Sequence, residues 1–271
     1  MPINTEAATP FAEAALALCP DGPPRVWSFI VTVFGDTAGD GSADIAAGPL
    51  ARILAPAGIS GAAMRVALHR LKVDGWITAR RVGRSSAYKL HPDRLAETQA
   101  ASRRIYAAEP PTEDAWQVLI GPPGAAVGQP GAVPIAPRIA LRPKPAASLA
   151  ENTGADQSGS AHMLILDGRS KVPSWLRAEI CPDDLLDAYA ALYTGLHQVE
   201  RLTRGAVFGT PAETIALRLL VVHAWRRVLL RHPHLPDQLF PEGWKGADCR
   251  HLVTTLLARL PRPSEAEIAQ L

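Results

Sequence analysis

The chain has 271 residues, of which 47% are hydrophobic and 20% charged, and its formal net charge is +2. This length predicts two or three domains, each with a packed core. The apolar run Phe11–Cys19 carries Glu13 and has no Lys or Arg before it, which excludes a typical secretory signal. No stretch approaches the ~20 apolar residues that span a bilayer. Three widely spaced cysteines favour reduced thiols. We therefore expect a cytoplasmic protein.

Positive charge is concentrated in one stretch. Residues 60–104 contain 10 Lys or Arg and 3 Asp or Glu, a net charge of +7, which leaves 18 against 23, or −5, for the rest of the chain. Because the small total charge hides this segregation, it does not exclude a nucleic-acid partner.

The N-terminal third is predicted to be helical. Val26, Phe29, Ile30 and Val33 recur at helical spacing, and Gly35 is expected to end their helix. In chain order we expect a tail at 1–24 with one short helix at Thr9–Leu18, and then this first buried helix at 25–35. A Gly- and Asp-rich loop at 36–48 and a second helix at 46–54 follow.

A third helix and a hairpin follow. Ser60 is placed to cap a helix that runs to Asp74 and stops at Gly75. Helical spacing places Met64, Ala67, Leu68 and Leu71 on the side that faces the core. It places Gly61, Arg65, His69 and Lys72 on the opposite side. The β-prone runs Trp76–Arg81 and Ala87–Leu90 flank a glycine turn, which predicts a hairpin.

The order helix, turn, helix, basic hairpin is that of a winged helix-turn-helix, which inserts its second helix into the major groove of duplex DNA. We expect Arg65, His69 and Arg70 near base edges and the hairpin tip at phosphates. The complete predicted DNA-binding set is Ser60, Arg65, His69, Arg70, Lys72, Arg81, Arg84, Ser85, Ser86 and Tyr88. The alternative is a winged-helix module whose basic face contacts other proteins.

The rest of the chain is predicted to change from strands to helices. Seven prolines between Ile120 and Pro145 indicate little helix there, and Glu151–Ser160 is expected to be a flexible loop. The predicted strands are Trp116–Ile120, Val133–Leu141 and His162–Leu166. The predicted helices are Ala96–Tyr106, Pro182–Val199, Pro211–Arg231 and Gly246–Leu260.

These elements predict an α+β protein in four sequential segments. A tail at 1–24 precedes a winged-helix DNA-binding domain at 25–106, a small central α/β domain with the proline-rich segment at 107–170, and a helical domain at 171–271.

No enzyme, metal or cofactor motif stands out. The chain lacks a nucleophile elbow, a P-loop, a dinucleotide fingerprint and a His-Glu-x-x-His helix. Asp183 and Asp184 precede a helix, where carboxylates favour the helix dipole. The spacing of His232, His234 and Asp237 does not favour a metal site. We therefore expect no enzyme and no cofactor, although an enzyme acting on acyl thioesters remains an alternative.

The sequence resembles the PaaX family, the repressors of phenylacetic acid degradation and their relatives. The resemblance rests on the segments Phe34–Asp36, Leu54–Ser60, Met64–Leu71, Gly75–Trp76, Gly83–Tyr88, Trp225–Pro236, Leu239–Pro241 and Gly243–Gly246. It implies a homodimeric repressor on a palindromic operator, with an N-terminal winged helix, a ferredoxin-like central domain and a C-terminal helical domain. The proline-rich segment Gly121–Pro145 departs from the family, in which a helix lies between strands.

The resemblance also implies a small-molecule effector, an aryl-acetyl coenzyme A thioester in the best-known members. Guanidinium groups suit phosphate oxygens, and tryptophans suit an aromatic acyl group. The candidate effector-binding residues are Trp116, Trp225, Arg226, Arg227, Arg231 and His232. The alternatives are that the arginines pair with nearby acids or helix ends, and that these tryptophans, with Trp175 and Trp244, belong to the core.

Overall fold

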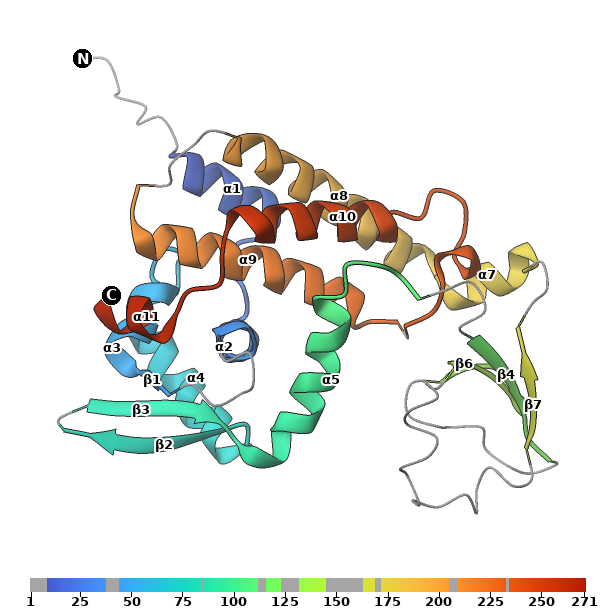
Figure 1. The fold of residues 1–271 in the computed structure, drawn as a ribbon, viewed down its shortest axis with the longest axis horizontal. Helices are drawn as coiled ribbons and strands as arrows, with labels where there is room; N and C mark the ends of the chain where they lie inside the picture. Colours follow the sequence, from blue (N-terminus) through green and yellow to red (C-terminus); the bar gives the residue numbers. More distant parts are fainter. Residues whose placement is uncertain are drawn as a thin grey trace. The chain divides into compact units, whose positions relative to one another are not determined.

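The structure is a computed structural model that describes residues 9–37, 44–83, 85–111, 116–122, 132–144, 163–168, 172–204, 209–232 and 234–271. Helices predominate, and two small antiparallel sheets accompany them (Figure 1). This confirms the predicted α+β class at the level of secondary-structure content.

The chain forms two compact units. Unit 1 comprises residues 1–106, 191–227 and 249–271, and unit 2 comprises residues 107–190 and 228–248. Sequence periodicity predicts sequential domains, whereas both units are discontinuous, because helices far apart in the sequence pack on each other. Unit 1 thus combines the N-terminal third of the chain with most of the C-terminal helices.

Among its described residues, the N-terminal part of unit 1 contains five α-helices and a three-stranded sheet of order β1-β3-β2. The helices are α1 (Pro10–Leu18), α2 (Val26–Thr37), α3 (Ala47–Leu54), α4 (Gly61–Val73) and α5 (Leu95–Ile105), with the 3-10 turn η1 (Pro92–Arg94) before α5. The strands are β1 (Ile45–Ala46), β2 (Ile77–Val82) and β3 (Ser85–Leu90). Their core includes Phe29, Ile30, Leu50, Ile53 and Leu71, each at most 2% exposed.

Two local predictions in this region are wrong. Gly35 does not end α2, which continues to Thr37 because Asp36 and Thr37 are themselves buried and the Thr37 hydroxyl donates to the Val33 carbonyl at 2.6 Å. Ile45 and Ala46 form a strand rather than loop, since Ile45 is buried and pairs with Tyr88 of β3. Both departures come from tertiary packing that overrides local propensity.

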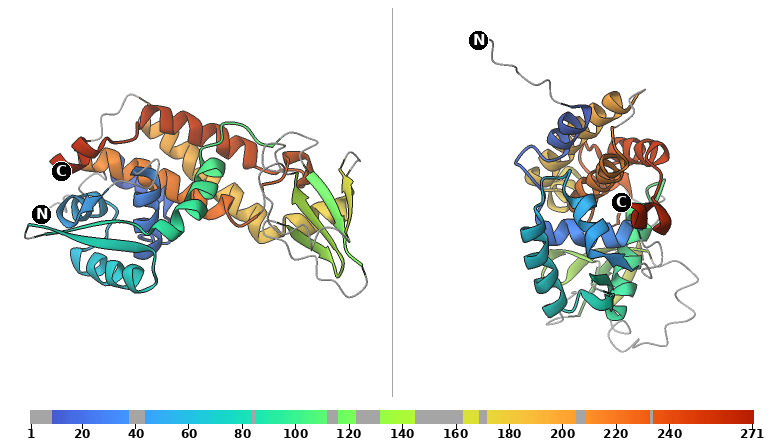
Figure 2. Two further views of the ribbon diagram at one scale, coloured as in Figure 1. Left: turned by 60° about the horizontal axis from the view of Figure 1, so that its bottom comes forward. Right: turned by 90° about the vertical axis from the view of Figure 1, so that its left-hand side faces the viewer.

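The C-terminal helices complete unit 1. They are α8 (Asp183–Thr203), α9 (Pro211–Leu229) and α10 (Gly246–Arg259), each of which extends into unit 2, and α11 (Glu265–Gln270). Within unit 1, α9 runs beside α10 (Figures 1 and 2), and every α9 residue from Ile215 to Trp225 is buried. The sequence did not predict α11, which begins with a capping box between Ser264 and Glu267 and packs on α3 and β1.

Unit 2 contains a four-stranded antiparallel sheet of order β5-β6-β4-β7. Its strands are β4 (Trp116–Ile120), β5 (Val133–Ala136), β6 (Ile139–Pro143) and β7 (Leu164–Asp167). The segment predicted as one strand, Val133–Leu141, is instead a hairpin, because the chain turns at residues 137 and 138 and pairs Val133 with Leu141. Helix α7 (Ser174–Ile180) and the 3-10 turn η2 (Asp237–Leu239) were not predicted, and α7 packs on β5 and η2. The predicted loop 151–160 lies outside the described residues.

Candidate nucleic-acid interface

Helix α4 presents one buried and one exposed side. Ser60 caps it, with Oγ accepting from the Ala63 amide at 3.2 Å, and Gly75, at φ +69°, follows its end. Its buried residues are Met64, Ala67, Leu68 and Leu71, which confirms the predicted inward set. Packing on α2 and α3 therefore fixes which side of α4 faces solvent.

The exposed side of α4 carries only positive charge. Among the described residues, Arg65, His69 and Lys72 have no ion-pair partner, and the helix contains no Asp or Glu. Arg70 lies 3.5 Å from Asp74, but both side chains are about half exposed or more, so the pair contributes little stability and leaves Arg70 available. This side of the helix can therefore approach an anionic partner.

The hairpin β2–β3 lies beside α4 in unit 1 (Figure 2). Val82 pairs with Ser85, and Gly83 adopts φ +60° in the connecting turn, a conformation that glycine adopts without strain. Arg81 is exposed, and its Nε donates to the Gly83 carbonyl at 3.2 Å, so the side chain lies along the turn. Arg84 of the predicted set lies outside the described residues.

The neighbouring Arg80 behaves differently. It forms an ion pair with Asp44 at 2.7 Å, across strand β3. Its charge is therefore already balanced within the protein, whereas Arg81 makes no ion pair with a described residue.

The hairpin hydroxyls differ in exposure. Ser85 is exposed, Ser86 is half-buried, and Tyr88 is half-buried in the middle of β3, between Ile45 and Ala79. The structure thus gathers the described members of the predicted DNA-binding set on α4, at its N-cap and on the adjacent hairpin, where Ser86 and Tyr88 are the half-buried members.

Three candidate effector residues lie on α9 in unit 1. Trp225 is 1% exposed, and its Nε1 donates to the Ile105 carbonyl at 3.0 Å. Arg226 is half-buried and donates to Ser28 Oγ at 3.2 Å, and burial lowers the pKa of its guanidinium. Arg227 is exposed. Trp225 and Arg226 therefore have structural contacts that connect α9 to α5 and α2.

The other three candidates lie in unit 2. Trp116 is 5% exposed on β4, and its Nε1 has no hydrogen-bond partner among the described residues. Arg231 pairs with Asp184. His232 is 8% exposed, its Nε2 lies 2.7 Å from the Tyr189 hydroxyl, and its ring contacts those of Phe240 and Trp244. His232 is thus part of a buried aromatic cluster.

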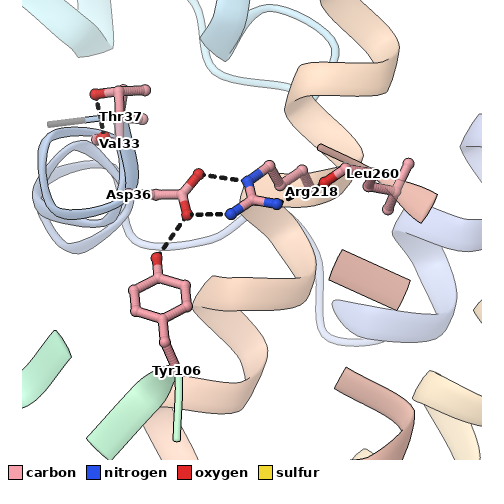
Figure 3. Close-up of polar contacts among 6 residues, drawn as sticks. All are labelled: Val33, Asp36, Thr37, Tyr106, Arg218 and Leu260. Carbon is pink, nitrogen blue, oxygen red and sulfur yellow. Dashed lines mark hydrogen bonds and ion pairs between the residues drawn. The ribbon is translucent and has the colours of Figure 1, made fainter. Parts of the chain in front are cut away.

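The structure also contains a buried ionic network that the sequence did not predict (Figure 3). Arg218 of α9 donates to both carboxylate oxygens of Asp36 on α2, at 2.7 and 2.9 Å, and to the Leu260 carbonyl at 2.5 Å. The Tyr106 hydroxyl donates to Asp36 at 2.5 Å, and burial together with the Asp36 charge raises the pKa of Tyr106. Asp36 stood within a segment of the family resemblance, but nothing in the sequence indicated its partner.

Other kinds of site find little support among the described residues. No group of three or more His, Cys, Asp or Glu side chains there could hold a metal ion, and Asp237 accepts instead from Trp244 Nε1 at 3.2 Å. None of the three cysteines forms a disulfide. Within the described ranges, no helix is long and apolar enough to cross a membrane.

Comparisons with known proteins cover most of the chain. The family described as PaaX-like protein matches residues 25–94, and the PaaX-like protein C-terminal domain matches residues 182–270. The transcriptional repressor PaaX of Escherichia coli strain K12 is 30% identical over 265 residues, which cover 90% of this chain and 83% of that protein. Among solved structures, the uncharacterized protein Rv0674 from Mycobacterium tuberculosis is 20% identical, with 88% of this chain and 97% of that chain covered and a TM-score of 0.47.

These sequence matches define a transcriptional regulator and not an enzyme, as the sequence predicted. The chain belongs to the PaaX family. This confirms the family that the motifs of the sequence indicated.

Proposed function

We propose that the chain is a winged helix-turn-helix repressor that binds duplex DNA through α4 and the β2–β3 hairpin. The observation that carries the proposal is the set of exposed basic side chains on these two elements, Arg65, His69, Lys72 and Arg81, which lack carboxylate partners among the described residues. Helix α4 would enter the major groove, and the hairpin would contact phosphates.

The remaining parts of the proposal rest on family membership. Two copies of the chain bind a palindromic operator of an aromatic-acid catabolic operon, and a small acid or its coenzyme A thioester releases them. Ligand release requires that the ligand binds the free dimer more tightly than the DNA-bound one. Of the six candidate effector residues, Arg227 has the surroundings that best suit an anion, because it is exposed and makes no ion pair with a described residue.

The experiment is a binding titration of the full-length protein on a duplex from the region upstream of its own gene, at several salt concentrations. Each phosphate contact releases condensed counterions, so log K should fall with log [salt] by about 0.9 per contact. Charge reversal at Arg65, Arg81 and Arg84 together should abolish specific binding. A flat salt response, or full affinity in the charge-reversed variant, would show that the basic face contacts proteins instead.

A second titration tests the effector. Aryl acids and their coenzyme A esters are added to the preformed complex, and release is compared between the free acid and the thioester. If no compound of either class releases the DNA, the proposed effector class is wrong while DNA binding stands. Size-exclusion chromatography with light scattering on the same preparation tests the dimer.

A further inference from the structure

The exposed side of α4 has an apolar centre. Successive residues of a helix are rotated by about 100°, so the buried residues of α4 define the direction of the core. The residues that project away from it, diametrically opposite, are Ala62, Val66, His69 and Val73.

Packing within the chain does not account for the two valines on this line. Val66 is 73% and Val73 70% exposed, the highest values among the large hydrophobic side chains that the structure describes as exposed. Valine is also a poor helix former, because its branched Cβ loses rotamer freedom in a helix. At these two exposed positions, burial of the side chain does not compensate for the low helix propensity of valine.

Cations flank this apolar line on both sides. Arg65 and Lys72 lie along one edge and Arg70 along the other. Nη1 of Arg65 lies 3.6 Å from the position that a Cβ of Gly61 would occupy, so the side chain folds back over the first turn of α4. A second copy of the same face would be repelled by these charges. The major groove offers the complement, with phosphates along both walls and base edges, including the thymine C5-methyl group, on its floor.

The geometry points to Val66 as a specificity-determining residue that contacts the C5-methyl group of a thymine in each operator half-site. This inference rests on the proposed function. Recognition helices present their N-terminal residues to base edges, and Val66 lies in the second turn of α4. Val73 lies about 10 Å further along the axis, in the last turn, and remains outside the groove.

The test uses the full-length protein and a duplex that carries the upstream segment it protects from nuclease digestion. Each thymine is replaced in turn by deoxyuridine, which lacks only the methyl group. The wild type should lose affinity about four-fold at one position of each half-site, the value of one buried methyl-sized group. Val66→Ala, which removes the contact in both half-sites of the dimer, should bind the thymine duplex about fifteen-fold more weakly, or about four-fold per half-site, and be indifferent to deoxyuridine at that position. Val73→Ala, an equally exposed residue on the same line, should match the wild type throughout.

The outcomes separate the two proposals. If the wild type binds no upstream DNA, the proposed function and this inference both fail, and the face is a protein-binding surface. If the wild type binds but Val66→Ala keeps the wild-type response at every thymine, or if Val73→Ala shows the same loss as Val66→Ala, only the role of Val66 is overturned. Both substitutions are at exposed helical positions and replace valine with a better helix former, so the folded state is retained.

Discussion

Unit 1 uses arginine in two opposite ways. On α4 and β2, Arg65 and Arg81 are exposed and make no ion pair with a described residue. On α9, Arg218 is buried with its guanidinium bonded to Asp36 and the Leu260 carbonyl. The same charged group therefore serves as a binding group in one place and as a link between helices in the other. The availability of a carboxylate partner decides between the two.

The contrast has an energetic basis. A buried ion pair gains little net stability, since desolvation offsets most of the attraction, yet loss of one partner leaves an isolated buried charge. An exposed arginine is hydrated and contributes almost nothing to folding. Substitution of a buried arginine should accordingly lower protein stability, whereas substitution of an exposed arginine should lower DNA affinity.

The largest effect is expected at the buried arginine. Arg218→Met removes the partner of Asp36, whose side chain is fully buried, and should lower the free energy of unfolding by about 3–5 kcal/mol. Urea denaturation followed by circular dichroism measures this loss. The double variant Asp36→Leu with Arg218→Met should recover part of the stability, because no unpaired charge then remains. If the single variant is as stable as the wild type, the network of Figure 3 does not join α2 to α9 as described.

The second effect compares adjacent arginines of β2. Arg81→Ala should weaken DNA binding about ten-fold per half-site at low salt and reduce the salt slope by about 2, as expected for one lost phosphate contact in each half-site of the proposed dimer. Arg80→Ala serves as the matched control, since Arg80 is already paired with Asp44 at 2.7 Å. It should leave the salt slope unchanged. Equal slopes for the two variants would contradict the distinction between free and paired arginines on this strand.

Helix α4 and the hairpin were predictable because their signals are local. The inward set of α4 follows from helical periodicity, and Ser60 and Gly75 mark its ends. The hairpin follows from two β-prone runs around a glycine turn, and β2 and β3 do pair in antiparallel fashion.

The ionic network was not predictable because its signal is not local. Asp36 and Arg218 are separated by 182 positions, and no periodic pattern relates them. Strand β1 is too short to show alternation, and it exists only because β3 offers an edge for pairing. The C-terminal arginines illustrate the same limit, since the sequence could not show that Arg226 contacts Ser28 while Arg227 faces solvent.

A third, smaller effect is expected at His223 of α9, which lies near the charges of Arg226 and Arg227. His223 is 1% exposed, and its Nδ1 lies 2.9 Å from Thr32 Oγ1. Burial, with the charges of Arg226 and Arg227, lowers the pKa of His223 to about 3. Below the unfolded pKa of about 6.5, the unfolded chain takes up a proton that the folded chain refuses until about pH 3. The free energy of unfolding therefore decreases as the pH is lowered from about 6.5 to about 3, and His223 does not affect it at higher pH.

Denaturation at pH 7 and pH 5.5 measures this contribution. The wild type should lose about 1 kcal/mol from this residue between the two conditions, and His223→Gln, which cannot titrate but can still bond Thr32, should lose that much less. An identical pH dependence in the two proteins would show that folding does not lower the pKa of His223.

The smallest effect is expected at the exposed arginine of α9. Arg227→Met should change the free energy of unfolding at pH 7 by less than about 0.5 kcal/mol, because the side chain is exposed and makes no ion pair with a described residue. Its charge nevertheless lowers the pKa of His223, so the substitution should raise that pKa and make the variant slightly less sensitive to acid than the wild type. Denaturation near pH 3, where His223 of the folded state begins to take up its proton, resolves the difference. A large loss at pH 7 would place Arg227 with the buried, structural arginines, whereas an altered effector response at unchanged stability would place it with those that bind ligands.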